Sequence, residues 1–267
     1  MQKAPLPFLI SIPHGGTKVP PELDNRVVIT RHDLFDDSDS FTNDIYDVNG
    51  LVVKALKTDI ARAFVDLNRA PDKVPPAYPD GVIKSCTCLR RPIYAENKHP
   101  DAALRQQLIE SYYKPYHTEL NVWSHFPKIK LGLDCHSMLP IAPAISPDSG
   151  EKRPLINLGN LDGAACPNEI MKLLADAFCL VFGIDAENVT LNRPFKGGYI
   201  TKKYACKPIP WIQIEMNRIL YLDEAWFDCA SLSIDHRRLA TLNLHVAQVI
   251  THFHDTIQKR YPEFLHG

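Results

Sequence analysis

The chain has 267 residues, of which 45% are hydrophobic and 23% are charged, and its formal net charge is −1 at pH 7. A chain of this length and composition can bury a sizeable core, and we expect a single domain over residues 1–267. The near-neutral charge excludes the strongly basic surface typical of nucleic-acid-binding proteins and favours a small-molecule or peptide ligand.

The sequence offers no targeting or membrane segment. The apolar residues 4–13 are interrupted by three prolines and are followed by no small-residue cleavage site, so we expect no signal peptide. No apolar stretch approaches the roughly twenty residues that cross a bilayer. The seven cysteines are odd in number and scattered, which is typical of reduced thiols. We therefore expect a cytoplasmic protein without a membrane partner.

Apolar runs predict five strands, and periodic stretches between them predict four helices. The expected strands are 7–12, 62–67, 128–134, 154–159 and 210–216. The expected helices are roughly 41–57, 101–124, 167–182 and 236–258. Strands that alternate with helices predict an α/β fold, with a mixed, mostly parallel sheet and helices on both of its faces.

Two of the predicted strands end beside a histidine. His14 follows the first strand and precedes Gly15 and Gly16, and His136 follows the strand 128–134. Open α/β sheets bind ligands beyond the carboxyl ends of their strands, and glycines let a ligand or backbone come close. Catalytic zinc takes three ligands from His, Asp, Glu or Cys and keeps one position open for water. We therefore expect one Zn²⁺ ion at this edge of the sheet.

The third metal ligand is sought in the acidic cluster Asp36-Asp37-Ser38-Asp39, which precedes the predicted helix 41–57. Acidic residues at this place also cap a helix and interact favourably with its dipole. Four acidic or capping residues exceed what capping needs, so one carboxylate is available to the metal. The residues alone leave open which aspartate that is.

Glu215 and Arg69 are the candidate catalytic residues. Glu215 lies inside a β-prone run, where an unpaired buried carboxylate would be costly, and we interpret it as a general base whose proton affinity is raised by desolvation. Arg69 can bind an oxyanion or a carboxylate through its planar guanidinium, and Asn68 beside it can donate a further hydrogen bond. The alternative is that Asp66 and Arg69 form an ion pair that stabilises a turn.

Residues 192–199 form a glycine-containing loop with three polar side chains suited to an acidic substrate, Arg193, Lys196 and Tyr199. We expect this loop to close over the carboxylates of the substrate as a lid. The alternative is a solvated turn with exposed basic residues.

In their order along the chain, these motifs resemble the N-formylglutamate amidohydrolase family, which is related at a distance to zinc carboxypeptidases and aspartoacylases. The resemblance covers most of the chain. It rests chiefly on Pro13-His14-Gly15-Gly16, Asp37-Ser38-Asp39, Asp66-Leu67-Asn68-Arg69, Asp134-Cys135-His136-Ser137, Lys196-Gly197-Gly198 and Gln213-Ile214-Glu215.

The resemblance implies a zinc-peptidase-like α/β sheet and a metal held by His14, His136 and Asp39, with Asp37 as the alternative acidic ligand. Carboxypeptidases and aspartoacylases take their acidic ligand three residues after the first histidine, where this chain has Thr17. The assignment to Asp39 therefore depends on the family and not on local spacing.

The resemblance also places Glu215 where such enzymes keep their general base, and Asn68 and Arg69 where carboxypeptidase-like enzymes hold the substrate. It implies metal-dependent hydrolysis of a small N-acyl amino acid, with N-formyl-L-glutamate giving formate and glutamate. One alternative is a zinc carboxypeptidase or amidase that acts on short peptides or cell-wall fragments.

Two further alternatives are weaker on chemical grounds. A non-enzymatic protein that binds a small acid would have no use for a base such as Glu215. A cysteine hydrolase with Cys135 beside His136 is disfavoured, because adjacent residues on a strand point to opposite faces of the sheet.

Overall fold

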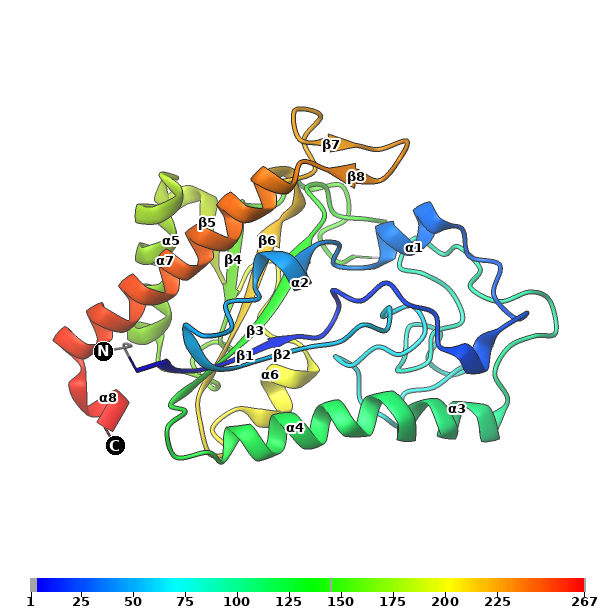
Figure 1. Cartoon of the computed structure of the whole chain (residues 1–267), viewed down its shortest axis with the longest axis horizontal. Coiled ribbons are helices and arrows are strands. Elements are labelled where there is room, and N and C mark those ends of the chain that lie inside the picture. Colours follow the sequence, from blue (N-terminus) through cyan, green and yellow to red (C-terminus); the bar gives the residue numbers. More distant parts are fainter. Residues whose placement is uncertain (1–3, 145, 267) are drawn as a thin grey trace.

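The computed structural model describes residues 4–144 and 146–266, and its centre is a six-stranded sheet with the strand order β2-β1-β3-β6-β4-β5 (Figure 1). Its strands are β1 (Leu6–Ile12), β2 (Val52–Lys57), β3 (Leu131–Met138), β4 (Ile156–Gly159), β5 (Val189–Leu191) and β6 (Trp211–Asn217). Strands β2, β1, β3 and β6 are parallel, whereas β4 is antiparallel to β6 and parallel to β5. The predicted mixed, mostly parallel sheet is therefore confirmed. A small antiparallel pair, β7 (Phe227–Asp228) and β8 (Ser233–Ile234), lies apart from it.

Helices cover both faces of the sheet, as predicted. They are α1 (Arg31–Asp37), α2 (Thr42–Ile45), α3 (Ala102–Leu108), α4 (Lys114–Ser124), α5 (Asn168–Phe182), α6 (Tyr199–Tyr204), α7 (His236–Arg260) and α8 (Pro262–His266). Figure 1 shows α5 and α7 on one side of the sheet, with α4 and α6 on the other. One turn of π-helix, Ile109–Tyr113, joins α3 to α4, so the predicted helix 101–124 is nearly continuous.

Helix α7 packs through a stripe of apolar residues spaced three and four apart. Leu242, Val246, Val249 and Phe253 are all buried, and the Phe253 ring stacks on Phe8 of β1 with 5.7 Å between centroids. Burial of such a side chain contributes about 1.5–3 kcal/mol relative to exposure. The period of the sequence therefore identified both the helix and the face that it presents to the sheet.

Two sequence predictions are wrong in this region of the fold. Residues 62–67 form turns and not a strand: the amide of Phe64 donates to the carbonyl of Ala61 at 3.0 Å, and the apolar side chains are buried in the core without joining the sheet. The predicted helix 41–57 ends after α2, and the strand β2 occupies its second half. A turn with Gly50 at φ +89° breaks the helical period there, and the β-branched Val52 and Val53 favour a strand.

Strand β3 extends past its predicted end, so His136 lies inside the strand and not beyond it. The register pairs His136 with Glu215 and Asp134 with Gln213. Side chains two apart on a strand share a face, so these four polar groups lie on one face of the sheet. Cys135 belongs to the apolar core on the opposite face.

Candidate metal centre and substrate pocket

Three side chains from separate segments form a buried group that could hold a metal ion: His14, Asp39 and His136. The Nδ1 atoms of His14 and His136 are 3.1 Å apart, and Asp39 Oδ2 lies 3.1 Å from His136 Nδ1 and 3.4 Å from His14 Nδ1. Zinc bonds of about 2.0–2.2 Å in a tetrahedron separate ligand atoms by about 3.3 Å. The donor types and their spacing therefore fit a zinc ion.

The loop after α1 brings Asp39 to the histidines, because the Asp39 amide donates to the carbonyl of His14 at 3.1 Å. Asp37, the alternative ligand, accepts a hydrogen bond from the Cys88 amide at 2.7 Å and pairs with Lys84 at 3.3 Å. Of the two aspartates that the sequence left open, the structure groups Asp39 with the histidines.

Both imidazoles are held from behind by a buried carboxylate. His14 Nε2 lies 2.8 Å from Asp66 Oδ1, and His136 Nε2 lies 3.2 Å from Asp134 Oδ1. An aspartate that accepts from Nε2 fixes the tautomer and directs the lone pair of Nδ1 away from itself. This arrangement leaves both Nδ1 atoms facing Asp39, as metal binding requires.

Arginines contact the second oxygen of Asp39. Arg218 Nη2 lies 3.4 Å and Arg62 Nη1 3.6 Å from Asp39 Oδ1. Burial alone would raise the pKa of Asp39, but hydrogen bonds from His136 and His14, together with the charge of Arg62, hold it well below its usual range. Asp39 is therefore a carboxylate at neutral pH.

Glu215 faces the same region from β6. It is buried, and Gln213 Nε2 donates to its Oε1 at 2.8 Å. Burial raises the pKa of Glu215 to about 8, against an opposing effect of the charge on His136. This upward shift of the pKa agrees with the expectation from the sequence that desolvation raises the proton affinity of Glu215.

Asn68 lies beside His136, and Arg69 lines the same pocket. Asn68 Nδ2 is 3.2 Å from His136 Nε2, while its Oδ1 accepts from the Ile200 amide at 2.7 Å. The Arg69 guanidinium binds Asp80 through the side chain at 2.7 Å and the carbonyl at 3.0 Å. The expected alternative, an Asp66–Arg69 ion pair, is not the arrangement found.

These side chains line a pocket of about 630 Å³. The lining includes residues 194–198, in which Gly198 has no side chain and so can lie against Asn68 and Gln213. A Cβ on Gly198 would lie 2.3 Å from Asn68 Nδ2, and the Gly198 amide donates to Gln213 Oε1. The loop 194–198 therefore contacts Asn68 and Gln213 directly.

The three basic or aromatic residues predicted for this loop lie in different places. Lys196 lines the pocket, but its ammonium pairs with Asp162 at 2.7 Å. Arg193 is exposed, and Tyr199 packs against the His117 ring with 5.9 Å between centroids; neither is among the residues lining the pocket. The structure thus brings one of the three to the pocket.

Several polar residues at the candidate site were not assigned a role from the sequence. Those that line the pocket or contact His136 are Arg62, Asp134, Arg153, Lys202, Gln213 and Arg218. Asp134 and Gln213 each stand two residues before a predicted site residue, and that spacing places both on the site face of a strand. The basic residues carry no comparable signal, because distant segments bring them to the pocket.

Cys135 offers no nucleophile to this site. It is buried on the opposite face of the sheet, and burial raises its thiol pKa well above the usual value. The sequence argument against a cysteine hydrolase therefore agrees with the structure.

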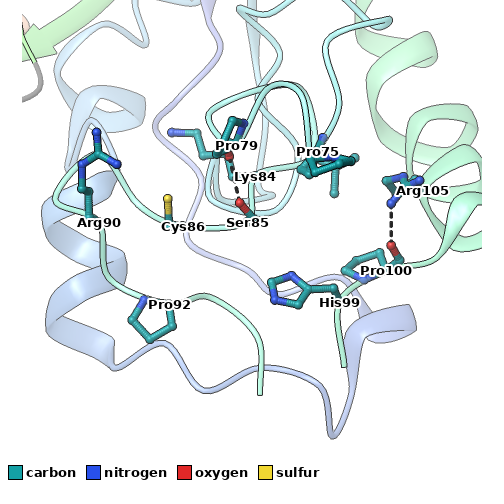
Figure 2. A pocket seen from close by; sticks show the side chains of 12 residues that line it. Pro75, Pro79, Lys84, Ser85, Cys86, Arg90, Pro92, His99, Pro100 and Arg105 are labelled. Atoms are coloured by element: carbon teal, nitrogen blue, oxygen red, sulfur yellow. Dashed lines mark hydrogen bonds between the residues drawn. The ribbon is translucent and has the colours of Figure 1, made fainter. Parts of the chain in front are cut away.

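A second pocket, of about 590 Å³, lies behind the loop that carries Lys84 (Figure 2). Lys84 and Pro79 form one wall, with His99 and Pro100 opposite. The Lys84 ammonium is turned to the carboxylates of Asp37 at 3.3 Å and Asp80 at 3.0 Å. The loop thus separates this pocket from the charged groups beside the metal centre.

Within residues 4–144 and 146–266, none of the helices combines the length and the apolar character needed to cross a membrane.

Comparisons with known proteins identify the family of the chain. Residues 6–222 match the protein family described as N-formylglutamate amidohydrolase. The N-formylglutamate deformylase of Pseudomonas aeruginosa is 30% identical over 233 residues, which cover 82% of this chain and 83% of that protein. The N-formylglutamate deformylase of Pseudomonas putida is 28% identical over 229 residues, with the same coverage of both chains.

Among solved structures, the N-formylglutamate amidohydrolase of Ralstonia eutropha JMP134 shares the fold, with a TM-score of 0.76 at 21% identity over 96% of both chains. A protein of Agrobacterium tumefaciens has a TM-score of 0.59 at 13% identity, over 94% of this chain and 90% of its own. The match of the family over residues 6–222 and the 30% identity to the Pseudomonas aeruginosa protein show that the chain belongs to the N-formylglutamate amidohydrolase family.

Proposed function

We propose that the protein hydrolyses the amide of a small N-acyl amino acid, and that N-formyl-L-glutamate is the substrate, giving formate and glutamate. The observation that carries this proposal is the buried group of His14, Asp39 and His136 with Glu215 paired to His136 across the strands, in a chain of this family. A carboxylate that can take a proton beside a metal group is the combination that amide hydrolysis needs.

The residues proposed to hold one Zn²⁺ ion are His14, Asp39 and His136, because their donor atoms are spaced for tetrahedral ligation. When bound, zinc supplies a water of lowered pKa and polarises the acyl oxygen. The two aspartates behind the imidazoles keep both rings in the tautomer that such a site requires.

Glu215 is proposed as the general base. Gln213 engages its Oε1, which leaves Oε2 to accept the proton of the attacking water and to return it to the leaving amine. Burial raises the pKa of Glu215 to about 8, within about one unit of neutral pH, which suits a group that takes up and then releases a proton.

Asn68 and Arg69 are proposed to hold the end of the substrate next to the scissile amide. Asn68 reaches His136, and Arg69 lines the same pocket with its guanidinium fixed by Asp80. A guanidinium that is already oriented offers hydrogen bonds to an oxyanion or to the α-carboxylate at little entropic cost.

We also propose a cytoplasmic location. All seven cysteines are unpaired, and this supports a reducing compartment.

The test is formate release from N-formyl-L-glutamate by protein of known metal content, before chelation, after chelation and after the return of zinc. We expect release that chelation abolishes and zinc restores. A protein that contains one zinc and releases no formate would redirect the assignment to other N-acyl amino acids. A protein that is active without any metal would contradict the role of the His-Asp-His group.

A further inference from the structure

The basic residues that line the substrate pocket differ in whether their charge is already compensated. Arg62, Arg69, Arg153, Lys196 and Arg218 each contact an internal acceptor. Among the described residues that line the pocket, Lys202 is the one basic side chain whose ammonium has no hydrogen-bond or ion-pair partner. A guanidinium has five N–H donors, so Arg69 can bind a carboxylate besides Asp80, whereas an ammonium without a partner can bind an anion without breaking an existing pair.

The position of Lys202 in α6 ties it to the site. Its amide donates to the carbonyl of Gly198 at 3.1 Å, so it lies one helical turn beyond the glycine that contacts Asn68. The neighbouring Thr201 points to the sheet, where its hydroxyl donates to Asp134 Oδ2 at 3.3 Å. Lys202 is exposed to solvent and lines the pocket one helical turn beyond the glycine that contacts Asn68.

An N-acyl glutamate carries two carboxylates at different distances from the amide that is cleaved. The α-carboxylate is adjacent to that amide and is assigned to Asn68, which lies 3.2 Å from His136, and to Arg69, which lines the same pocket. The side-chain carboxylate is two bonds more distant and would lose water in the pocket, so it needs a cation of its own.

We propose that Lys202 binds the side-chain carboxylate of the substrate and thereby selects glutamate over glutamine as the acylated amino acid. This inference rests on the proposed function and names the residue that determines its specificity. It also replaces Arg193 and Lys196, which the sequence favoured for this task, because Arg193 does not line the pocket and Lys196 is paired with Asp162.

The first experiment measures kcat/KM for N-formyl-L-glutamate and for N-formyl-L-glutamine. We expect Lys202→Met to lower the value for the glutamate substrate by about 10- to 100-fold, the effect of losing one hydrogen bond to a charged group, and to change the glutamine substrate little. Lys203→Met is the matched control: Lys203 is also exposed and adjacent, but it does not line the pocket, and its ammonium lies over the rings of Tyr199 and Tyr204. Equal loss for both substrates, or no loss, would overturn the proposal.

A second experiment separates this proposal from the proposed reaction. Calorimetric titration with L-glutamate and L-glutamine tests the zinc-loaded wild type and both variants without any turnover. We expect Lys202→Met to lose the preference for L-glutamate and Lys203→Met to keep it, even if formate release fails. A wild type that binds neither amino acid, or a Lys202→Met variant with unchanged affinity for L-glutamate, would contradict the role of Lys202.

Discussion

His14 and His136 each use one ring nitrogen for an aspartate and present the other to Asp39. By accepting from Nε2, Asp66 and Asp134 therefore keep Nδ1 of each histidine available as a lone-pair donor. A histidine without such a partner can rotate or change tautomer, and outer-shell partners of this kind typically change metal affinity by about 10- to 100-fold. Asp66 and Asp134 therefore belong to the candidate site as much as the proposed metal ligands do.

Glu215→Gln should abolish turnover and leave the metal content intact, because glutamine has nearly the same shape but cannot accept a proton. We expect a fall in kcat of about 10²- to 10⁴-fold, as for the loss of a general base. The measurement is formate release together with bound zinc by elemental analysis. His14→Ala is the contrasting variant and should lose the metal; a Glu215→Gln enzyme that remains active would refute the mechanism.

The sequence was sufficient to propose His14, His136 and Glu215, because each is a chemically unusual residue at or near the end of an apolar run. It could not assign Asp66 or Asp134 their roles, since these depend on distances of about 3 Å between separate segments. It favoured Arg193 for the same reason that it missed Lys202: local composition shows which residues are basic but not which way a turn or short helix points them.

At the scale of elements, the loop 194–198 packs against the turn that carries Asn68, and this contact positions one wall of the pocket. The Gly198 amide is held by Gln213, and Gln213 also donates to Glu215. One carboxamide therefore connects the loop to the proposed base.

Gly198→Ala should lower kcat/KM, because the added Cβ would lie 2.3 Å from Asn68 Nδ2 and would push the loop outward. Overpacking of this kind typically destabilises a protein by about 1–3 kcal/mol. Steady-state kinetics and thermal unfolding measure the two effects. Gly183→Ala is the control: Gly183 ends α5 at φ +63°, so alanine there should reduce stability and leave the kinetics unchanged. Unchanged kinetics for Gly198→Ala would show that the loop does not need this contact.

The prediction of strands and helices succeeded where an apolar repeat extends over many residues, as in α7. It failed where apolar residues are buried by turns and not by a strand. Residues 62–67 are apolar because turns carry them into the core, and apolar content alone does not separate that case from a strand. The direction of β4 was also beyond the sequence, since a strand has the same pattern in either direction.

At the scale of the whole molecule, a buried network of opposite charges adjoins the candidate metal site through Asp66, which contacts both His14 and Lys84. Lys84 is fully buried and contacts Asp37, Asp66 and Asp80 at 3.0–3.6 Å. Burial alone would raise the pKa of Asp37 and of Asp80, but Lys84 and neighbouring arginines hold both below the usual value. A carboxyl group whose pKa is lowered by folding stabilises the folded state when the pH is above its unfolded-state pKa, near 3.8. That stabilisation is lost as the pH falls through the lower pKa of the folded state.

Lys84→Met should therefore lower the free energy of unfolding by about 3–5 kcal/mol at pH 7, because it leaves buried carboxylates without a partner. It should also move acid unfolding to higher pH, since the folded pKa values of Asp37 and Asp80 rise. Denaturant unfolding and an acid titration followed by circular dichroism measure both effects. Lys18→Met provides the comparison, because the Lys18–Asp59 pair is exposed and should contribute about 0–1 kcal/mol. Equal responses of the two variants would show that the buried network does not stabilise the fold.

The reversed direction of β4 has a consequence for how this scaffold can diversify. Because β4 runs against β6, the chain leaves the sheet after β3 and enters it again at the same edge, beside the candidate site; residues 139–144 and 146–155 lie between the two strands. The described residues of this segment that line the pocket are Leu139, Pro143, Ser146, Pro147 and Arg153. None of the segment's described residues belongs to a strand of the central sheet or to the proposed metal ligands, and the segment is tied to β6 at its end, where the Asn217 amide donates to the Leu155 carbonyl at 2.8 Å. Loop length costs little free energy, so insertions or exchanges in this segment can reshape the pocket entrance and leave the register of the catalytic strands intact. We therefore expect sequence changes in this segment to alter the range of substrates while the proposed metal ligands and Glu215 keep their positions.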